Sequence, residues 1–134
     1  MTPTDGGLPA PDAAWEVETP SGLARMHYFG VPRGGARATL VLGHGAGRGV
    51  DSRELVAIAG ALPEAEGVDV VLVEQPWHVK GRRVAGAPPT LDKAWTACLR
   101  DLKGRSIGVR RLVVGGRSAG ARVAVLDRIK SFVT

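Results

Sequence analysis

Three short apolar runs stand out along the chain. They are rich in Val and Leu, and they cover residues 38–42, 68–74 and 111–115. Runs of this kind are typical of strands that are buried on both faces of a parallel sheet. Two earlier β-prone stretches, residues 15–17 and 24–29, lie on either side of a Thr-Pro-Ser-Gly turn signal and predict an antiparallel hairpin.

Segments with apolar residues at helical spacing follow the apolar runs. In the first, Asp51 or Ser52 can cap a helix whose apolar stripe includes residues 55–62. A second helix is predicted over residues 91–102 with Thr90 as its cap, and a third over residues 121–134. Strand and helix therefore alternate after the hairpin. This order indicates an α/β fold with right-handed crossovers and a mostly parallel sheet covered by helices on both faces.

The length of 134 residues has room for one domain. Residues 1–14 are rich in Pro, Gly, Ala and Asp, and we expect them to form a flexible leader, with the domain itself at 15–134. Apolar residues make up 44% of the chain and charged residues 23%, which favours a globular protein over a disordered one.

The net charge of +5 comes from basic residues that are scattered along the chain. The densest groups, at 80–83 and 105–111, do not alternate with aromatic residues, and no zinc-finger or RNA-binding motif is present. We interpret these residues as a solvated surface and expect no nucleic-acid partner. An acidic substrate or a weak polyanion contact is the alternative.

The single cysteine, Cys98, excludes an internal disulfide and a cysteine-based metal site, and its apolar neighbours predict a core position. No apolar run reaches the roughly 18 residues of a membrane span. The start of the chain lacks the basic and apolar regions of a signal peptide. We therefore expect a cytoplasmic protein without membrane contact, metal or cofactor.

The sequence Gly116-Arg117-Ser118-Ala119-Gly120 has the pattern G-x-S-x-G between a predicted strand and a predicted helix. A serine on such a tight turn projects its hydroxyl at the carboxyl end of the sheet, and the glycines allow strand and helix to approach closely. The amide of Ala119, at the helix N-terminus, is then aimed at the oxyanion of an acyl transfer. A turn that merely caps the helix is the alternative.

A glycine-rich loop, His44-Gly45-Ala46-Gly47, directly follows the first predicted parallel strand. An oxyanion hole needs a second N–H donor, and in this architecture the donor comes from that loop. We predict that Ala46 supplies it. His44 is expected to support the loop rather than act as a base, because its position places it beside the oxyanion hole.

Five segments together resemble the α/β-hydrolase superfamily. They are LVLGHGAG from Leu40, VEQPW from Val73, GRRV from Gly81, LDKAW from Leu91 and LVVGGRSAGARVA from Leu112. The chain is most similar to the dienelactone-hydrolase-like domain of small bacterial hydrolases and of the testis-expressed and NSL-complex hydrolase-like proteins, over residues 15–124. The resemblance implies a partial α/β-hydrolase fold. It also implies that Ser118 is the nucleophile, and that Ala119 and the loop at 44–47 form the oxyanion hole.

The chain departs from this family after residue 124. In the family an acid and then a histidine follow the nucleophile, but here only Asp127 and no histidine follow Ser118. Asp127 lies about 13 Å along the predicted helix and points away from the site. His27 is placed on an early strand, and His78, at the carboxyl end of a strand, is a candidate for a pocket-lining or catalytic residue. The chain is therefore interpreted as truncated or frame-shifted, with an exposed sheet edge that favours self-association or a protein partner.

Three functions follow from these patterns. The first is a serine hydrolase that cleaves an ester, thioester or related acyl bond of a small substrate through an acyl-Ser118 intermediate, impaired here because the acid and histidine are absent. The second is a non-catalytic, hydrolase-like scaffold for protein interactions. The third, nucleotide binding, matches poorly, because Arg48 occupies the position of the third glycine of G-x-G-x-x-G.

Overall fold

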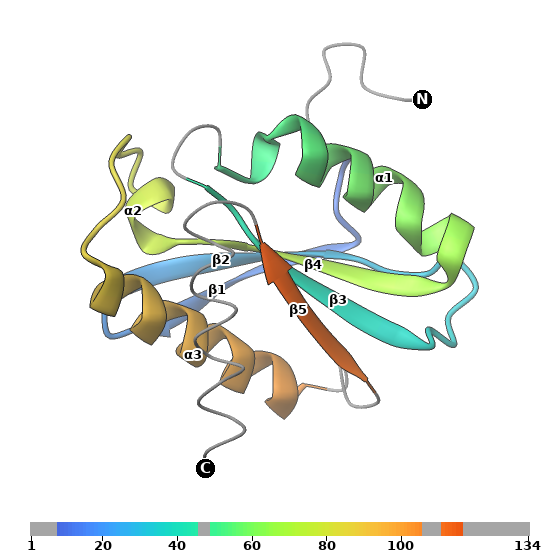
Figure 1. Cartoon of the computed structure of the whole chain (residues 1–134). Coiled ribbons are helices and arrows are strands. Elements are labelled where there is room, and N and C mark those ends of the chain that lie inside the picture. The colour runs from blue at the N-terminus through green and yellow to red at the C-terminus, as the bar shows by residue number, and fades with distance from the viewer. Residues whose placement is uncertain (1–7, 46–48, 106–110, 117–134) are drawn as a thin grey trace.

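The computed structural model describes residues 8–45, 49–105 and 111–116, which form one sheet with helices packed on it (Figure 1). The strands are β1 (Ala13–Thr19), β2 (Gly22–Phe29), β3 (Ala38–Gly43), β4 (Val68–Glu74) and β5 (Leu112–Gly116). The helices are a 3₁₀ turn η1 (Gly49–Asp51), α1 (Arg53–Glu66), α2 (Pro76–Val79) and α3 (Pro88–Gly104).

The strand order in the sheet is β1-β2-β4-β3-β5. The first two strands form the expected antiparallel hairpin, and β2 also pairs antiparallel with β4. On its other side β4 pairs parallel with β3, and β3 pairs parallel with β5. The predicted fold class, an α/β sheet opened by an antiparallel hairpin, is therefore confirmed.

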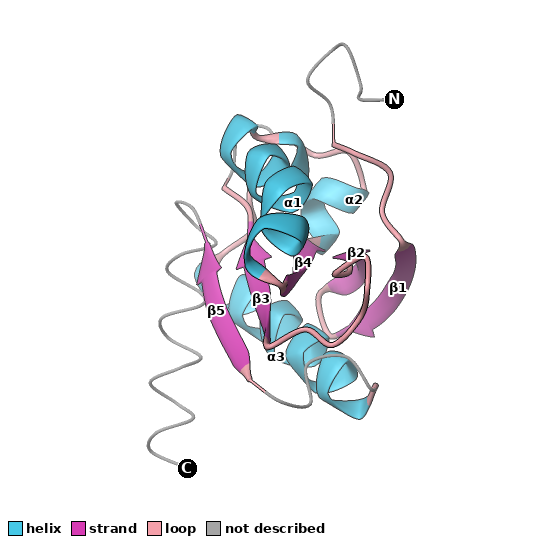
Figure 2. Ribbon diagram, turned by 90° about the vertical axis from the view of Figure 1, so that its right-hand side faces the viewer, coloured by secondary structure: helices cyan, strands magenta, loops and turns pink. Residues whose placement is uncertain are grey.

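Helices cover the two faces of the sheet, with α1 on one face and α3 on the other (Figure 2). Successive side chains of β4 point alternately into two hydrophobic cores, one on each face of the sheet, as the pleat of a strand requires. Val71 and Val73 belong to the core under α3, whereas Val70 and Leu72 belong to the core under α1.

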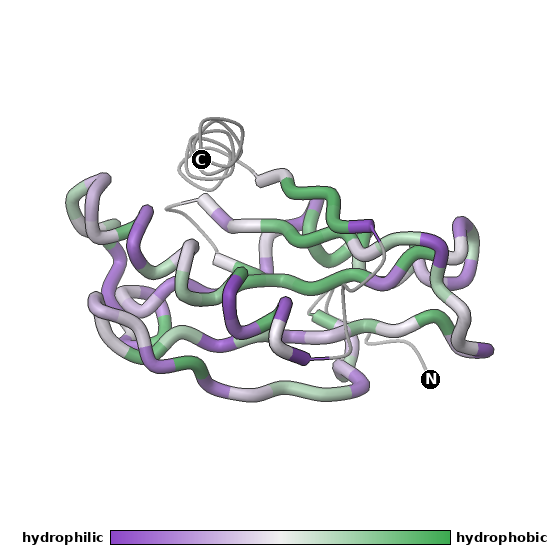
Figure 3. The backbone as a smooth tube through the Cα atoms, turned by 90° about the horizontal axis from the view of Figure 1, so that it is seen from below, coloured by the Kyte–Doolittle hydropathy of each residue, from purple (hydrophilic) through white to green (hydrophobic). Residues whose placement is uncertain are grey.

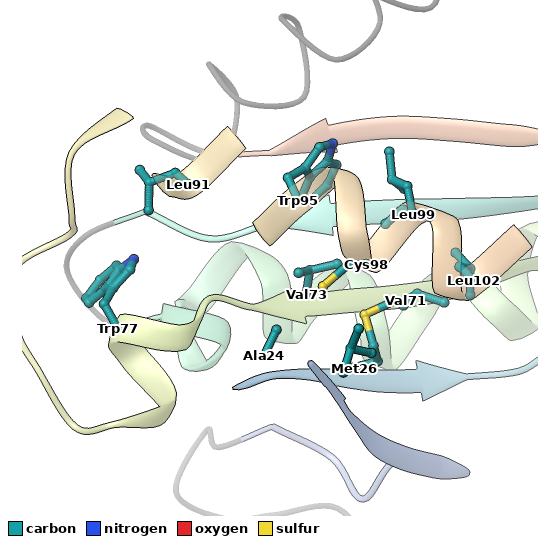
Figure 4. Packing of buried hydrophobic residues seen from close by; sticks show 12 residues of the cluster. Ala24, Met26, Val71, Val73, Trp77, Leu91, Trp95, Cys98, Leu99 and Leu102 are labelled. Carbon is teal, nitrogen blue, oxygen red and sulfur yellow. The ribbon is translucent and has the colours of Figure 1, made fainter. Parts of the chain in front are cut away.

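The core under α3 is the larger of the two. Figure 4 shows the apolar side of α3 facing the sheet, where Trp95, Cys98 and Leu102 are fully buried near Val73 and Met26. Cys98 therefore occupies the core position that was predicted for it. The apolar residues follow the central strands, while hydrophilic residues gather in the connections (Figure 3).

The start of α3 differs from the prediction, whereas the start of α1 agrees with it. Thr90 is not the cap of α3: the helix starts at Pro88 with Ala87 as its N-cap, and the hydroxyl of Thr90 donates to the Ala87 carbonyl at 2.6 Å. Proline is suited to the first turn because the N–H group that it lacks has no helical partner there. Ser52 is the N-cap of α1 as expected, although its side chain makes no capping hydrogen bond.

The short helix α2 was not predicted from the sequence, which indicated only a loop after β4. The helix predicted at 121–134 lies outside the described residues. In the part of the chain that is described, no helix combines the length and the apolar character needed to cross a bilayer.

Candidate functional site

Three parallel strands end at the same edge of the sheet. Gly43 at the end of β3 is in register with Val73 of β4 on one side and with Gly116 of β5 on the other. The strand ends that precede the predicted oxyanion loop and the predicted nucleophile turn are therefore adjacent. This edge is where α/β proteins place their ligands.

Ser118, Ala46 and Ala119 lie outside the described residues, so the structure gives the strands that carry them and not their own geometry. Ser118 is two residues beyond the end of β5, and Ala46 is three residues beyond the end of β3. The assignment of all three to the site stays a prediction.

Glycine before the nucleophile turn permits close packing of β5 against β3. Gly115 lies opposite Leu42, and a Cβ atom at position 115 would come within 3.2 Å of the Leu42 side chain. An alanine here would require the Leu42 side chain to shift by a few tenths of an ångström.

His44 is buried, and both of its ring nitrogens have backbone partners. Its Nε2 accepts a hydrogen bond from the Gln75 amide at 2.9 Å, which leaves the proton on Nδ1 to bond the Gly45 carbonyl at 2.8 Å. Burial lowers the pKa of His44, which keeps the imidazole neutral. Since neither nitrogen is available to take a proton from a substrate or a serine, His44 supports the loop.

Glu74, at the end of β4, binds two imidazoles at once. One carboxylate oxygen bonds His27 Nε2 of β2 at 2.9 Å, and the other bonds His78 Nδ1 of α2 at 2.7 Å. Burial favours the protonated acid, but the hydrogen bonds from the two histidines outweigh it and lower the pKa of Glu74 to about 2. The carboxylate is therefore ionised at neutral pH.

The ring of His78 packs against the loop that follows β3. A Cβ atom placed on Gly49 would lie 2.3 Å from His78 Nε2, so the ring touches the backbone there. The ring centroid of His78 is 5.0 Å from that of His44 and 5.5 Å from that of Trp77. His78 is thus a neighbour of the loop on the β4 side, with β3 between it and β5.

A pocket of about 210 Å³ lies beside α2 and the start of α3. Its walls are largely apolar, from Trp77, Pro76 and Leu91, and Lys80 and Arg82 add positive charge. It adjoins the carboxyl end of β4 through Gln75. Within the described ranges no group of three or more His, Cys, Asp or Glu side chains is placed to hold a metal ion.

Sequence reasoning missed Glu74, which organises this end of the sheet. The available signal was its place at the end of a buried strand, four residues before His78. Its other partner, His27, is 47 residues away and could not be found from spacing.

Comparisons with known proteins agree with this architecture. The family model described as an alpha/beta hydrolase domain matches residues 36–131. A search of curated proteins finds no match.

Several solved structures share the fold at low sequence identity. An alpha-beta serine hydrolase homologue from Coxiella burnetii has a TM-score of 0.70 and 16% identity over 90% of this chain and 58% of its own. A serine hydrolase without a lid from Xanthomonas campestris has a TM-score of 0.61 and 19% identity over 87% of this chain and 55% of its own. For a hyperthermophilic esterase from Pyrobaculum calidifontis, the TM-score is 0.65 and the identity 18%, over 89% and 39% of the two chains. The chain thus spans little more than half the length of the first two.

Proposed function

This chain belongs to the alpha/beta hydrolase domain family, and we propose that it carries the nucleophile half of a serine-hydrolase site, for cleavage of an ester, thioester or related acyl bond. The observation that carries this proposal is the register of β3 with β5, in which Gly43 pairs with Gly116. That pairing starts the glycine-rich loop and the G-x-S-x-G turn from neighbouring points of one sheet edge.

In this proposal the Ser118 oxygen attacks the acyl carbon, the bond from that carbon to the alcohol oxygen or thiol sulfur breaks, and the alcohol or thiol leaves with the proton that the serine loses. Water then hydrolyses the acyl-serine bond, which releases the acid and restores the serine hydroxyl. The amides of Ala119 and Ala46 stabilise the negative charge that develops on the carbonyl oxygen of the substrate. The pocket near Trp77 and Lys80 offers an apolar wall and positive charge beside the same edge, which suits a small acyl substrate with an anionic group.

The serine needs a base to remove its proton. No histidine follows Ser118 in these 134 residues. His44 has both nitrogens bound to backbone, and the other two histidines bind Glu74. We therefore propose that the chain by itself is an impaired hydrolase, because it lacks the histidine that follows the nucleophile in the family and Ser118 depends on a base from elsewhere.

A fluorophosphonate probe with imidazole as an external base tests this function. We expect slow labelling of the chain. Added imidazole should accelerate it, Ser118→Ala should abolish it and Thr19→Ala should leave it unchanged. Thr19 is a suitable control because its hydroxyl bonds the Gly22 carbonyl in the turn between β1 and β2 and does not line the pocket. Labelling that persists in Ser118→Ala, or that fails even with imidazole, would refute the proposal.

The second candidate is a hydrolase-like scaffold that binds another protein or a second copy of itself. The commitment of all three histidines to structural contacts favours it. Stoichiometric binding that Ser118→Ala leaves intact, without turnover of any acyl substrate, is the expected result. Loss of binding in that variant would point back to the hydrolase site.

We also propose a cytoplasmic location. The only cysteine, Cys98, is a buried free thiol, which fits a reducing compartment. Fractionation of cells that express the tagged protein checks this, and recovery in the secreted or membrane fraction would contradict it.

A further inference from the structure

We propose that His78 is a positioning residue that braces the loop after β3, with Glu74 holding its imidazole in place. This inference rests on the proposed function, because that loop is the expected source of the second oxyanion-hole amide.

The brace begins with a carboxylate that cannot turn freely. Glu74 bonds His27 of β2 through one oxygen and His78 of α2 through the other, and its side chain is only 12% exposed. Rotation of the carboxylate would break two short hydrogen bonds at once. Because the bond to His78 reaches Nδ1, it fixes the direction of Nε2 on the far side of the ring.

That far side of the ring meets Gly49. The backbone at Gly49 has φ +65°, and a Cβ atom there would lie within 2.3–2.7 Å of three atoms of the His78 ring. Such contacts leave no room for a side chain, so the imidazole is seated on the backbone itself. The rings of His44 and Trp77 lie beside it, with centroids at 5.0 and 5.5 Å.

The other end of the same segment is tied by His44. Its Nδ1 bonds the Gly45 carbonyl and its Nε2 accepts from the Gln75 amide, directly after Glu74. Gly45 and Gly49, which flank positions 46–48, are therefore both held against the end of β4 and the start of α2.

The same geometry argues against a catalytic role for His78. A general base must come within hydrogen-bond distance of the proton that it removes. The Nε2 atom of His78 instead faces the backbone of Gly49, and β3 separates β4 from β5. The hydrogen bond between Glu74 and His78 thus resembles the bond between the acid and the imidazole of a catalytic triad, but the pair supports the loop after β3.

A double-mutant cycle between positions 49 and 78 tests the contact. Gly49→Ala should destabilise the chain strongly, and the same change should cost less in a His78→Ala background, where the ring is absent. We expect a coupling of about tenfold or more in the unfolding equilibrium constant. Gly34, with φ +70° and open space around it, is the matched control, since Gly34→Ala should combine additively with His78→Ala. Additive effects at 49 and 78 would overturn the proposal.

Hydrogen exchange tests the positioning without any need for hydrolysis. His78→Ala should raise the exchange of amides in residues 43–52 by about tenfold or more while those of β4 keep their protection. His78→Asn should do the same, because it keeps a donor near the place of Nδ1 but lacks the ring. Unchanged exchange at 43–52, or an equal rise throughout the sheet, would show that His78 does not act on this loop.

Labelling of Ser118 connects the brace to the proposed function. The measurement is made at pH 9 and without imidazole, because imidazole could occupy the space that the His78 ring leaves in the variant. His78→Ala should lower the maximal labelling rate and leave the half-saturating probe concentration unchanged. Arg83→Ala, an exposed change after α2 at a residue that does not line the pocket, should alter neither. If the unmodified chain is not labelled even with added imidazole, the proposed function is refuted, and the double-mutant cycle and the exchange measurement still test whether His78 holds this loop.

Discussion

The three histidines show that the partners of a residue decide its role. His44 could be assigned to loop support from the sequence because it follows a buried strand within a glycine-rich loop. His27 and His78 could not be assigned in this way, since their shared partner Glu74 joins residues from distant parts of the chain. The sequence carries the chemistry of each side chain but not the tertiary contact that uses it.

Removal of the His44 ring should weaken the fold measurably. His44→Ala leaves the buried Gln75 amide without its acceptor and opens space in the core, so we expect a loss of at least about 2 kcal/mol in the free energy of unfolding. Urea denaturation measures it. Arg25→Ala is the control, since its ion pair with Glu16 joins two half-exposed side chains and should contribute less than about 1 kcal/mol. Similar losses in both variants would argue against the role given to His44.

Among the elements, the buried strands were the most predictable from sequence. The bounds of β4 were predicted as observed, because the apolar residues 70–73 lie in a short segment between Gly67 and Pro76, which is typical of a buried strand. The helix α2 was missed since its four residues are too few to show a period. The start of α3 was predicted three residues too late, at residue 91, although the first helical turn accepts the prolines at positions 88 and 89.

The helix α1 offers two glycines on which one substitution should have opposite effects. Gly60 is exposed in the middle of the helix with open space around it, so Gly60→Ala should stabilise the chain by about 0.5–1 kcal/mol. Gly67 also has open space, but it is the C-cap with φ +65°, where alanine is strained by about 1 kcal/mol. Thermal melts of the two variants should therefore shift in opposite directions, and a common direction would contradict the helix end described here.

At the scale of the whole molecule, the described residues form two cores and a sheet edge at which three parallel strands end. The predicted nucleophile and oxyanion donors, Ser118, Ala119 and Ala46, lie beyond the described strand ends, so the structure gives the strands that precede them and their assignment to a site stays a prediction. In the described sheet β5 is the outermost strand beside β3, and Val113 on it is 40% exposed. Self-association through this edge therefore stays a prediction from the sequence.

The dependence of stability on acidic pH follows from His44 and Glu74, which lie where β3 and β4 end. The pKa of His44 is lowered from its ordinary 6.5, chiefly by burial, so the unfolded chain binds this proton more readily and stability falls as the pH drops below about 6.5. The pKa of Glu74 is lowered from 4.5 to about 2. Its contribution is complete above pH 4.5 and is lost progressively between pH 4.5 and 2.

Urea titrations at a series of pH values should therefore show the free energy of unfolding falling in two stages, one below about pH 6.5 and one below pH 4.5. Glu74→Gln should remove only the second fall. That substitution keeps the size of the side chain and removes the ionisation. His44→Asn is the complementary variant, because it should remove the fall that begins near pH 6.5 and leave the one below pH 4.5. If Glu74→Gln keeps the slope of the native chain below pH 4.5, the two imidazoles do not hold Glu74 ionised, and the carboxylate that orients His78 loses its physical basis.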